Sequence, residues 1–175
     1  FNSISSIELS DELYGRAKKR FKRHSKVTLH HGDSATELPK ILEILQHRAI
    51  FWLDAHYSGD GTAKGDMDTP VIKELRALST HSIKDHVILI DDARYFNGKN
   101  DYPTIEECRG VVAEILPRHR FHVENDIIQI IPMSTIVPGS ELSEEPAGAS
   151  NSTAGVWGHW CRAVWPRRAM PINVH

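Results

Sequence analysis

Acidic side chains stand directly after four short apolar runs in this 175-residue sequence. Because the strands of a parallel sheet end at one edge, where ligands bind, these groups are expected to meet there. Crowded carboxylates repel one another unless a cation or ligand hydroxyls compensate their charge. The groups, in chain order, are Glu8, the Gly32-Asp33-Ser34 loop, Asp54 followed closely by His56, and the Asp91-Asp92 pair.

Two kinds of chemistry fit these groups. Asp54, Asp91 and Asp92 offer the hard oxygen ligands that Mg²⁺ or another divalent cation prefers. Glu8 lies where an acidic side chain at the end of the second strand of a nucleotide-binding fold grips ribose hydroxyls. A single acid at a strand end is as often a turn former or a helix cap, so the prediction depends on all four positions together.

Alternating apolar and amphipathic segments predict the elements that position these groups. Strands are expected at 4–8, 26–30, 49–53 and 87–90, with an amphipathic helix after each. Two further runs, 120–124 and 127–131, flank Asn125-Asp126 as a two-residue hairpin. The predicted fold class is therefore α/β, a Rossmann-like open sheet that is mostly parallel with a C-terminal antiparallel hairpin.

Capping residues predict where the helices begin. Ser10 caps the first helix, and Thr104 with Glu107 forms a capping box for the last. In the second helix, a cap at Ser34 would put Pro39 in the interior, where its missing N–H is costly. Thr36 is the predicted cap because it places Pro39 in the first turn, where no donor is needed.

The remaining segments are assigned from composition. Residues 1–132 are expected to form one domain, and 133–175 a linker and tail, because Ser, Glu, Pro, Gly and Ala dominate the stretch after Pro132. The segment 156–165 has helical spacing of its apolar residues. The glycine-rich stretch at 55–68 is interpreted either as a mobile lid over the acidic edge or as a plain connection.

Charge and cysteine content narrow the partners and the location. The chain has 21 basic and 23 acidic side chains and a net charge of −2, which argues against a nucleic-acid protein driven by phosphate neutralisation. No apolar run reaches the roughly 20 residues that cross a bilayer. With two cysteines, Cys108 and Cys161, a reducing cytoplasm is the default location. The expected partner is a small-molecule substrate.

Four strings resemble a known family. SIELS (6–10), HHGDS (30–34), FWLDAH (51–56) and VILIDDAR (87–94) are similar to class I S-adenosylmethionine-dependent methyltransferases. The most similar branch is the metal-dependent O-methyltransferases, typified by catechol O-methyltransferase and the cephalosporin-hydroxylase-like proteins. The resemblance covers about residues 4–132, and it implies methyl transfer from S-adenosylmethionine to a small hydroxylated acceptor.

The resemblance implies roles for the strand-end groups. Glu8 would bind the cofactor ribose, and the loop containing Asp33 and Ser34 would meet the adenine. Asp54, Asp91 and Asp92 would hold Mg²⁺, which chelates two acceptor oxygens and lowers the pKa of the hydroxyl.

One catalytic position departs from the family pattern. Catechol-type enzymes place a lysine three residues after the first metal aspartate, and Tyr57 occupies that position here. His56 is therefore the predicted base, although a histidine beside a metal ligand can instead orient that ligand.

The family's first strand and glycine-rich loop would precede Ile4, and no such pattern is found there. A hole is then expected between strands 4–8 and 49–53, with weak S-adenosylmethionine binding as a consequence. Direct pairing of these two strands is favoured over insertion of 156–165 or over a homo-oligomer formed through the incomplete sheet.

Two other functions stay open. A metal-dependent phosphoesterase or nucleotidyl transferase could use Asp54, His56, Asp91 and Asp92 on a similar sheet, but it would have no use for Glu8 or Asp33. A non-catalytic domain could keep the fold and pair through the gap. Binding of an adenosyl cofactor separates the methyltransferase from the first of these functions, and the absence of the glycine-rich loop favours the second.

Overall fold

Seven strands and four α-helices follow one another along the residues that the computed structural model describes, which are 1–54, 69–135 and 170–174. The strands are β1 (Ile4–Glu8), β2 (Val27–His31), β3 (Ala49–Leu53), β4 (Val87–Ile90), β5 (His119–Glu124), β6 (Ile127–Pro132) and β7 (Met170–Val174). The helices are α1 (Asp11–Phe21), α2 (Ser34–Ile44), α3 (Val71–Thr80) and α4 (Ile105–Ile115). Every predicted strand is confirmed to within one residue at each end.

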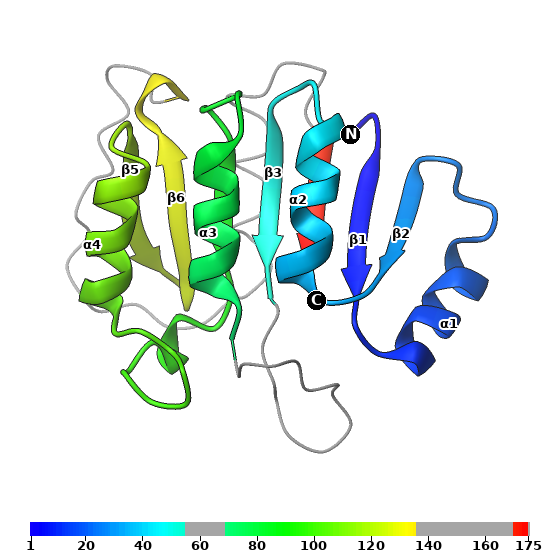
Figure 1. The fold of residues 1–175 in the computed structure, drawn as a ribbon, viewed down its shortest axis with the longest axis horizontal. Helices are drawn as coiled ribbons and strands as arrows, with labels where there is room; N and C mark the ends of the chain where they lie inside the picture. Colours follow the sequence, from blue (N-terminus) through cyan, green and yellow to red (C-terminus); the bar gives the residue numbers. More distant parts are fainter. Residues whose placement is uncertain (55–68, 136–169, 175) are drawn as a thin grey trace, which may run out of the picture.

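The strands form one sheet in the order β2-β1-β7-β3-β4-β6-β5 (Figure 1). Neighbours from β2 to β4 are parallel, whereas β6 runs antiparallel to both β4 and β5. Asn125 and Asp126 have φ values of 51° and 64°, as the predicted two-residue hairpin turn requires. The predicted fold class, an open α/β sheet that is mostly parallel with an antiparallel C-terminal hairpin, is confirmed.

The centre of the sheet differs from the expectation. β1 does not pair with β3, so the predicted direct closure is wrong. β7 lies between them and is parallel to both, with Ile172 opposite Ser5 on one side and Phe51 on the other (Figure 1). The expected hole is filled by a strand from the segment that was expected to be a tail. The segment 156–165, the alternative candidate for this central position, lies outside the described residues.

Three helices, α2, α3 and α4, cover one face of the sheet, while α1 lies beside the outer strand β2 (Figure 1). The Ser10 cap of α1 and the Thr104/Glu107 capping box of α4 are confirmed. Among the described residues, no helix is long and apolar enough to span a membrane. Fully buried side chains of the helices and the sheet form the core, including Ile7, Leu38, Phe51, Leu75, Ile88, Cys108 and Ile128.

α2 begins earlier than predicted. Its N-cap is Asp33 and not Thr36, because the Asp33 carboxylate accepts a hydrogen bond from the Ala35 N–H at 2.8 Å. Pro39 therefore lies inside the helix, where it lacks the N–H that would donate to the Ala35 carbonyl. The cap at Asp33 and the burial of Ser34 against the rest of the fold outweigh this loss.

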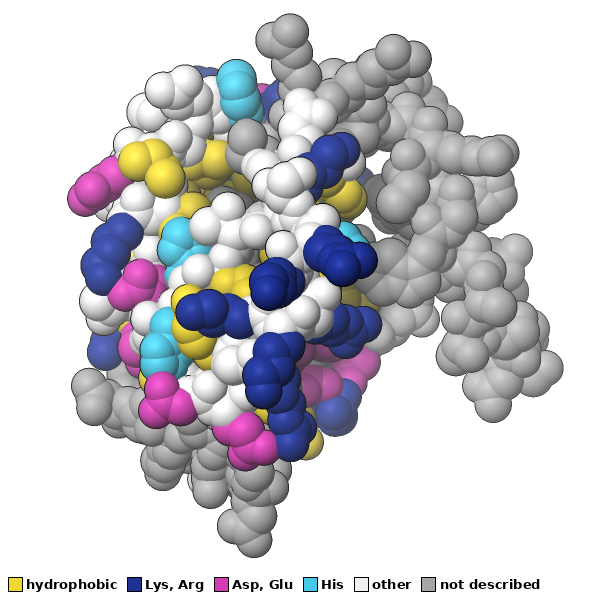
Figure 2. All heavy atoms as spheres, turned by 90° about the vertical axis from the view of Figure 1, so that its right-hand side faces the viewer, with side chains coloured by type: hydrophobic (Ala, Val, Ile, Leu, Met, Phe, Trp, Pro, Cys, Tyr) yellow, Lys and Arg dark blue, Asp and Glu magenta, His cyan; other side chains and the backbone are white. Residues whose placement is uncertain are grey.

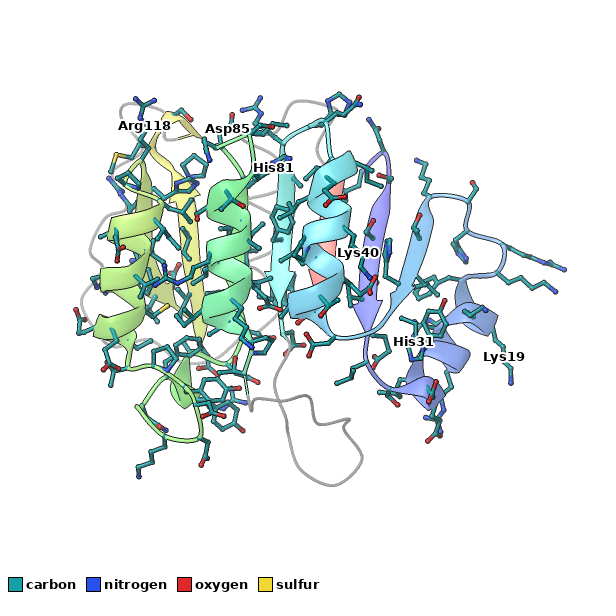
Figure 3. The ribbon with its side chains drawn as sticks, in the orientation of Figure 1. Lys19, His31, Lys40, His81, Asp85 and Arg118 are labelled. Atoms are coloured by element: carbon teal, nitrogen blue, oxygen red, sulfur yellow. The ribbon has the colours of Figure 1, made fainter. Side chains whose placement is uncertain are left out.

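Two histidines, His81 and His86, form a hydrogen-bonded chain at the amino ends of the parallel strands β3 and β4. Figure 3 labels His81 and the neighbouring Asp85. His86, 3% exposed, accepts a hydrogen bond at Nδ1 from the Ala49 N–H (3.1 Å), which assigns its proton to Nε2. That Nε2 then donates to His81 Nδ1 at 2.8 Å, and His81 Nε2 donates to the Leu45 carbonyl at 3.2 Å. Burial, followed by the effect of His81, lowers the pKa of His86 to about 4.

Replacement of His86 by asparagine (His86→Asn) is expected to make the protein more resistant to acid. As the pH falls below the unfolded pKa of about 6.5, only the unfolded chain binds the proton, so the wild type loses stability. Asparagine can still accept from the Ala49 N–H but does not titrate. As the pH falls from about 7 to about 4, the free energy of unfolding of the variant should increase relative to that of wild type by about 2 kcal/mol. This value allows for solvent screening on the side of the half-buried His81.

Urea unfolding at several pH values measures this difference. His24→Asn, a change at an exposed histidine, is the matched control and should leave the pH profile of wild type unchanged. The same pH dependence in wild type and His86→Asn would contradict the expected role of the buried ring.

Candidate functional site

The winding of the chain marks the carboxyl end of β7 as a candidate ligand-binding point. From β1 the chain winds outward to β2, then crosses back to β3 and winds outward in the other direction to β4. In open α/β sheets, ligands bind where this direction reverses, outside the carboxyl ends of the strands. Val174 of β7 is opposite Ile7 on one side and Leu53 on the other. The next residues, Glu8 and Asp54, therefore flank the reversal point.

Asp54 and Asp91 follow neighbouring strands at the same edge. Leu53 of β3 is paired with Ile90 of β4, and the Asp91 N–H donates to the Leu53 carbonyl at 3.0 Å. Both acids therefore come directly after a matched pair of strand residues. This register confirms that they share an edge, while their functional roles stay predictions.

The environment of Asp91 at this edge includes three other aspartates. Burial raises the pKa of Asp91, and the Asp92 N–H, which donates to Asp91 Oδ1 at 2.8 Å, lowers it. The charges of Asp54, Asp92 and Asp126 raise it again. Sequence reasoning missed Asp126 as a site residue, because its position predicts only a hairpin turn. The edge is therefore more acidic than the strand ends alone indicated.

A basic side chain compensates two of these acids. Asp92 has a left-handed φ of 56°, and its Oδ1 lies 2.6 Å from Arg94 Nη1. Arg94 also forms an ion pair with Asp126, and its backbone N–H donates to Asp126 Oδ1 at 2.8 Å. The segment after β4 is thereby tied to the turn of the β5–β6 hairpin. Arg94 stands in the VILIDDAR string, but its second partner is too far along the sequence to be found from spacing.

The predicted metal site is incomplete in the described part of the chain. No group of three or more His, Cys, Asp or Glu side chains is arranged there to hold a metal ion. The Arg94 ion pair gives one reason, since it occupies Asp92. His56, the predicted base, lies in the stretch 55–68, outside the described residues.

Tyr102 and Thr69 bring hydroxyl groups to the acidic edge. The two side chains are hydrogen-bonded, and this bond lowers the pKa of Tyr102. Burial is the largest effect on that pKa, and together with the charges of Asp92 and Asp54 it raises the value to about 12. The phenol therefore keeps its proton at neutral pH and can donate a hydrogen bond. Nothing in the spacing of Tyr102 or Thr69 predicts this position.

Glu8 supports the turn from β1 into α1. Its Oε1 accepts a hydrogen bond from the Ser10 N–H at 2.8 Å, and its side chain is half-buried. One carboxylate oxygen is thus held by the backbone beside the reversal point. That orientation is compatible with the predicted ribose contact, which stays a prediction.

Asp33 and Ser34 both belong to the start of α2, where Asp33 is the cap. Ser34 is 4% exposed and hydrogen-bonds the side chain of Glu74, which is 1% exposed in α3. In the described structure, Glu74 Oε1 has no hydrogen-bond partner. Burial raises the pKa of Glu74 to about 7, Asp33 adds to this effect, and the Ser34 bond opposes it. Sequence reasoning missed Glu74, although its position between Val71 and Leu75 places it on the apolar side of α3.

No family model matches the chain, and no curated protein matches it. Solved structures with a similar fold include a protein described as an rRNA-methylase from Clostridium thermocellum, at 15% identity and a TM-score of 0.48. Others are the fibrillarin pre-rRNA processing protein of Methanococcus jannaschii (14%, 0.44) and the SAH-bound methyltransferase PaMTH1 of Podospora anserina (15%, 0.45).

Each alignment covers 74% of this chain, and respectively 75%, 55% and 60% of the other three chains. At these identities the similarity concerns the fold alone. The strand order, the parallel pairing and the reversal of winding at β7 are properties of this chain itself. The fold is Rossmann-like.

Proposed function

We propose that this chain is an S-adenosylmethionine-dependent methyltransferase domain that binds its cofactor at the carboxyl end of β7. The observation that carries the proposal is the position of Glu8, half-buried at the end of β1 beside the reversal of winding. An acid at this point can accept hydrogen bonds from ribose hydroxyls. The resemblance of the four strings to class I methyltransferases supports an adenosyl cofactor, with Asp33 and Ser34 on the adenine side.

The proposed reaction is methyl transfer to the oxygen of a small hydroxylated acceptor. The acceptor hydroxyl loses its proton, its oxygen forms a bond to the sulfonium methyl carbon, and the carbon–sulfur bond breaks to release S-adenosylhomocysteine. Asp54 and Asp91 would orient the hydroxyl, and His56 would accept its proton. In-line positioning of the two substrates supplies much of the catalysis.

S-adenosylhomocysteine binding tests the central part of this proposal. Glu8→Gln is expected to weaken binding at least about tenfold, because a hydrogen bond to a charged acceptor contributes about 1.5–3 kcal/mol. Isothermal titration of wild type and variant measures the two dissociation constants. Glu12→Gln, at an exposed position in α1, is the matched control and should bind like wild type. The proposal fails if wild type does not bind, or if Glu8→Gln binds equally well.

A divalent cation is a second part of the proposal. Because Arg94 pairs with Asp92, Mg²⁺ would depend chiefly on Asp54 and Asp91, with waters or acceptor oxygens completing its shell. When bound, the cation supplies charge that lowers the pKa of the acceptor hydroxyl.

Asp91→Asn is expected to weaken Mn²⁺ binding at least about tenfold, because one of two principal carboxylate ligands loses its charge. Titration calorimetry with Mn²⁺ in place of Mg²⁺ measures this without any acceptor. Asp11→Asn, at an exposed position in the first turn of α1, is the control. Equal Mn²⁺ affinity in all three proteins would argue against the cation. Metal binding without S-adenosylhomocysteine binding would favour a phosphoesterase or nucleotidyl transferase.

A further inference from the structure

The basic residues of this chain are unevenly distributed. Residues 16–26 contain seven Lys and Arg side chains and no Asp or Glu, which leaves 14 basic against 23 acidic side chains in the rest of the chain. The net charge of −2 therefore hides a strongly basic segment on an otherwise acidic protein. We call this segment the α1 basic surface. Its members are Arg16, Lys18, Lys19, Arg20, Lys22, Arg23 and Lys26.

All seven side chains of the α1 basic surface are exposed. They gather on the side of the molecule formed by α1 and the chain leading into β2, as Figure 2 shows in dark blue. Lys19 points away from the sheet in Figure 3. Within the described structure, Arg16 is the one member that forms an ion pair, with Glu12 at 2.5 Å. The surface is therefore largely uncompensated by the protein itself.

Aromatic and imidazole rings lie within this surface. The exposed His31 ring stacks on Tyr14 with ring centres 4.6 Å apart, and the exposed His24 ring meets the edge of Phe21 at 5.7 Å. Lys18 lies over the Tyr14 ring. Rings interleaved with Lys and Arg are the combination that single-stranded nucleic acids bind, through base stacking and phosphate contacts.

The exposed residues of α1 also argue against a membrane surface. Each exposed position within the helix is charged, and the apolar residues Leu13, Ala17 and Phe21 are half-buried. A helix that lies in a membrane interface needs an exposed apolar face to insert. The charge pattern fits a ligand that offers phosphates and bases, and not a layer of lipid.

We propose that the α1 basic surface binds single-stranded RNA through its phosphate backbone, with little dependence on sequence. This binding surface lies apart from the acidic edge and does not depend on the proposed methyltransferase function. It revises the conclusion drawn from net charge alone, because phosphate neutralisation depends on local charge and not on the total.

Fluorescence anisotropy with a labelled poly(U) RNA of about 20 nucleotides tests the proposal over about 50–300 mM KCl. The test protein combines Lys19→Ala, Lys22→Ala and Arg23→Ala. The matched control removes the same charge from exposed positions elsewhere, with Lys73→Ala, Arg118→Ala and Arg120→Ala. Circular dichroism verifies that both triple variants are folded.

The α1 triple variant is expected to bind at least about tenfold more weakly than wild type, with a salt slope lower by about 2, since each lost phosphate contact removes about 0.7. The control triple variant should stay within about twofold of wild type. Absence of wild-type binding, or an equal loss in both triple variants, would overturn the proposal. So would α1-dependent binding to phosphatidylserine vesicles without RNA binding.

Discussion

Deletion of residues 170–175 is expected to abolish cooperative folding of the domain. β1 and β3 pair with β7 and not with each other, so the deletion leaves the facing edges of both strands without backbone partners. A buried backbone group without a partner costs on the order of 1–3 kcal/mol. Several such groups together exceed the roughly 5–15 kcal/mol by which a domain is stabilised.

Thermal and urea unfolding followed by circular dichroism measure this effect. The control deletes residues 1–3, which precede β1 at the other end of the described sequence, and should retain a cooperative transition. A synthetic peptide of residues 168–175 added to the shortened protein should restore the transition. If the shortened protein unfolds like wild type, β1 and β3 can close directly and the assigned role of β7 is wrong.

Replacement of Glu74 by glutamine (Glu74→Gln) is expected to stabilise the protein at neutral pH. The folded pKa of Glu74, about 7, lies above its ordinary value of 4.5. A carboxyl group whose pKa is raised by folding contributes stability that is fully present below its unfolded pKa. This stability is lost as the pH rises through the folded pKa. Glutamine keeps the shape and an acceptor for Ser34 but carries no charge. As the pH rises from about 4.5 to about 8, the free energy of unfolding of the variant should increase relative to that of wild type by about 3 kcal/mol.

Urea unfolding of wild type and Glu74→Gln across this pH range measures the gain. Glu43→Gln, at an exposed position on α2, is the control. His86 acts in the opposite direction between about pH 4 and 6.5, so the wild-type profile alone does not separate the two groups. A stability difference between wild type and Glu74→Gln that does not change with pH would show that Glu74 is not held in a low-dielectric site.

Local sequence patterns predicted most of the described elements. The continuous apolar runs at 49–53 and 87–90 indicated strands, and β3 and β4 have the same bounds. The capping box at Thr104 and Glu107 and the turn at Asn125-Asp126 were predicted because neighbouring residues determine them. These signals need no information about the rest of the fold.

Two features depend on distant contacts and were predicted wrongly. The string at 170–174 was assigned to the tail from composition, and it becomes a strand through pairing with β1 and β3. The start of α2 was predicted from the cost of an interior proline. Burial of Ser34 against Glu74 on α3, which spacing within α2 does not reveal, favours the earlier start.

The candidate site also combines features that local sequence predicts with features that depend on distant contacts. Strand ends alone predicted that Asp54 and Asp91 share an edge, since register between neighbouring parallel strands places them there. The ion pairs of Arg94 with Asp92 and Asp126, and the buried Glu74, arise from elements that meet only after folding. The sequence therefore predicts where an acidic edge forms, and tertiary contacts decide which of its carboxylates form ion pairs with Arg94.

The place of β7 also has a consequence for synthesis on the ribosome. The β1–β2 pair and the β3-β4-β6-β5 group contain none of residues 170–174, so both can form while the nascent chain still lacks that strand. Each group then presents an unpaired strand edge to chaperones and to neighbouring nascent chains. Pairing of Ser5 with Ile172 joins opposite ends of the described sequence, and contacts of such high sequence separation form slowly. The protein is thus most open to mispairing just before its central strand is translated.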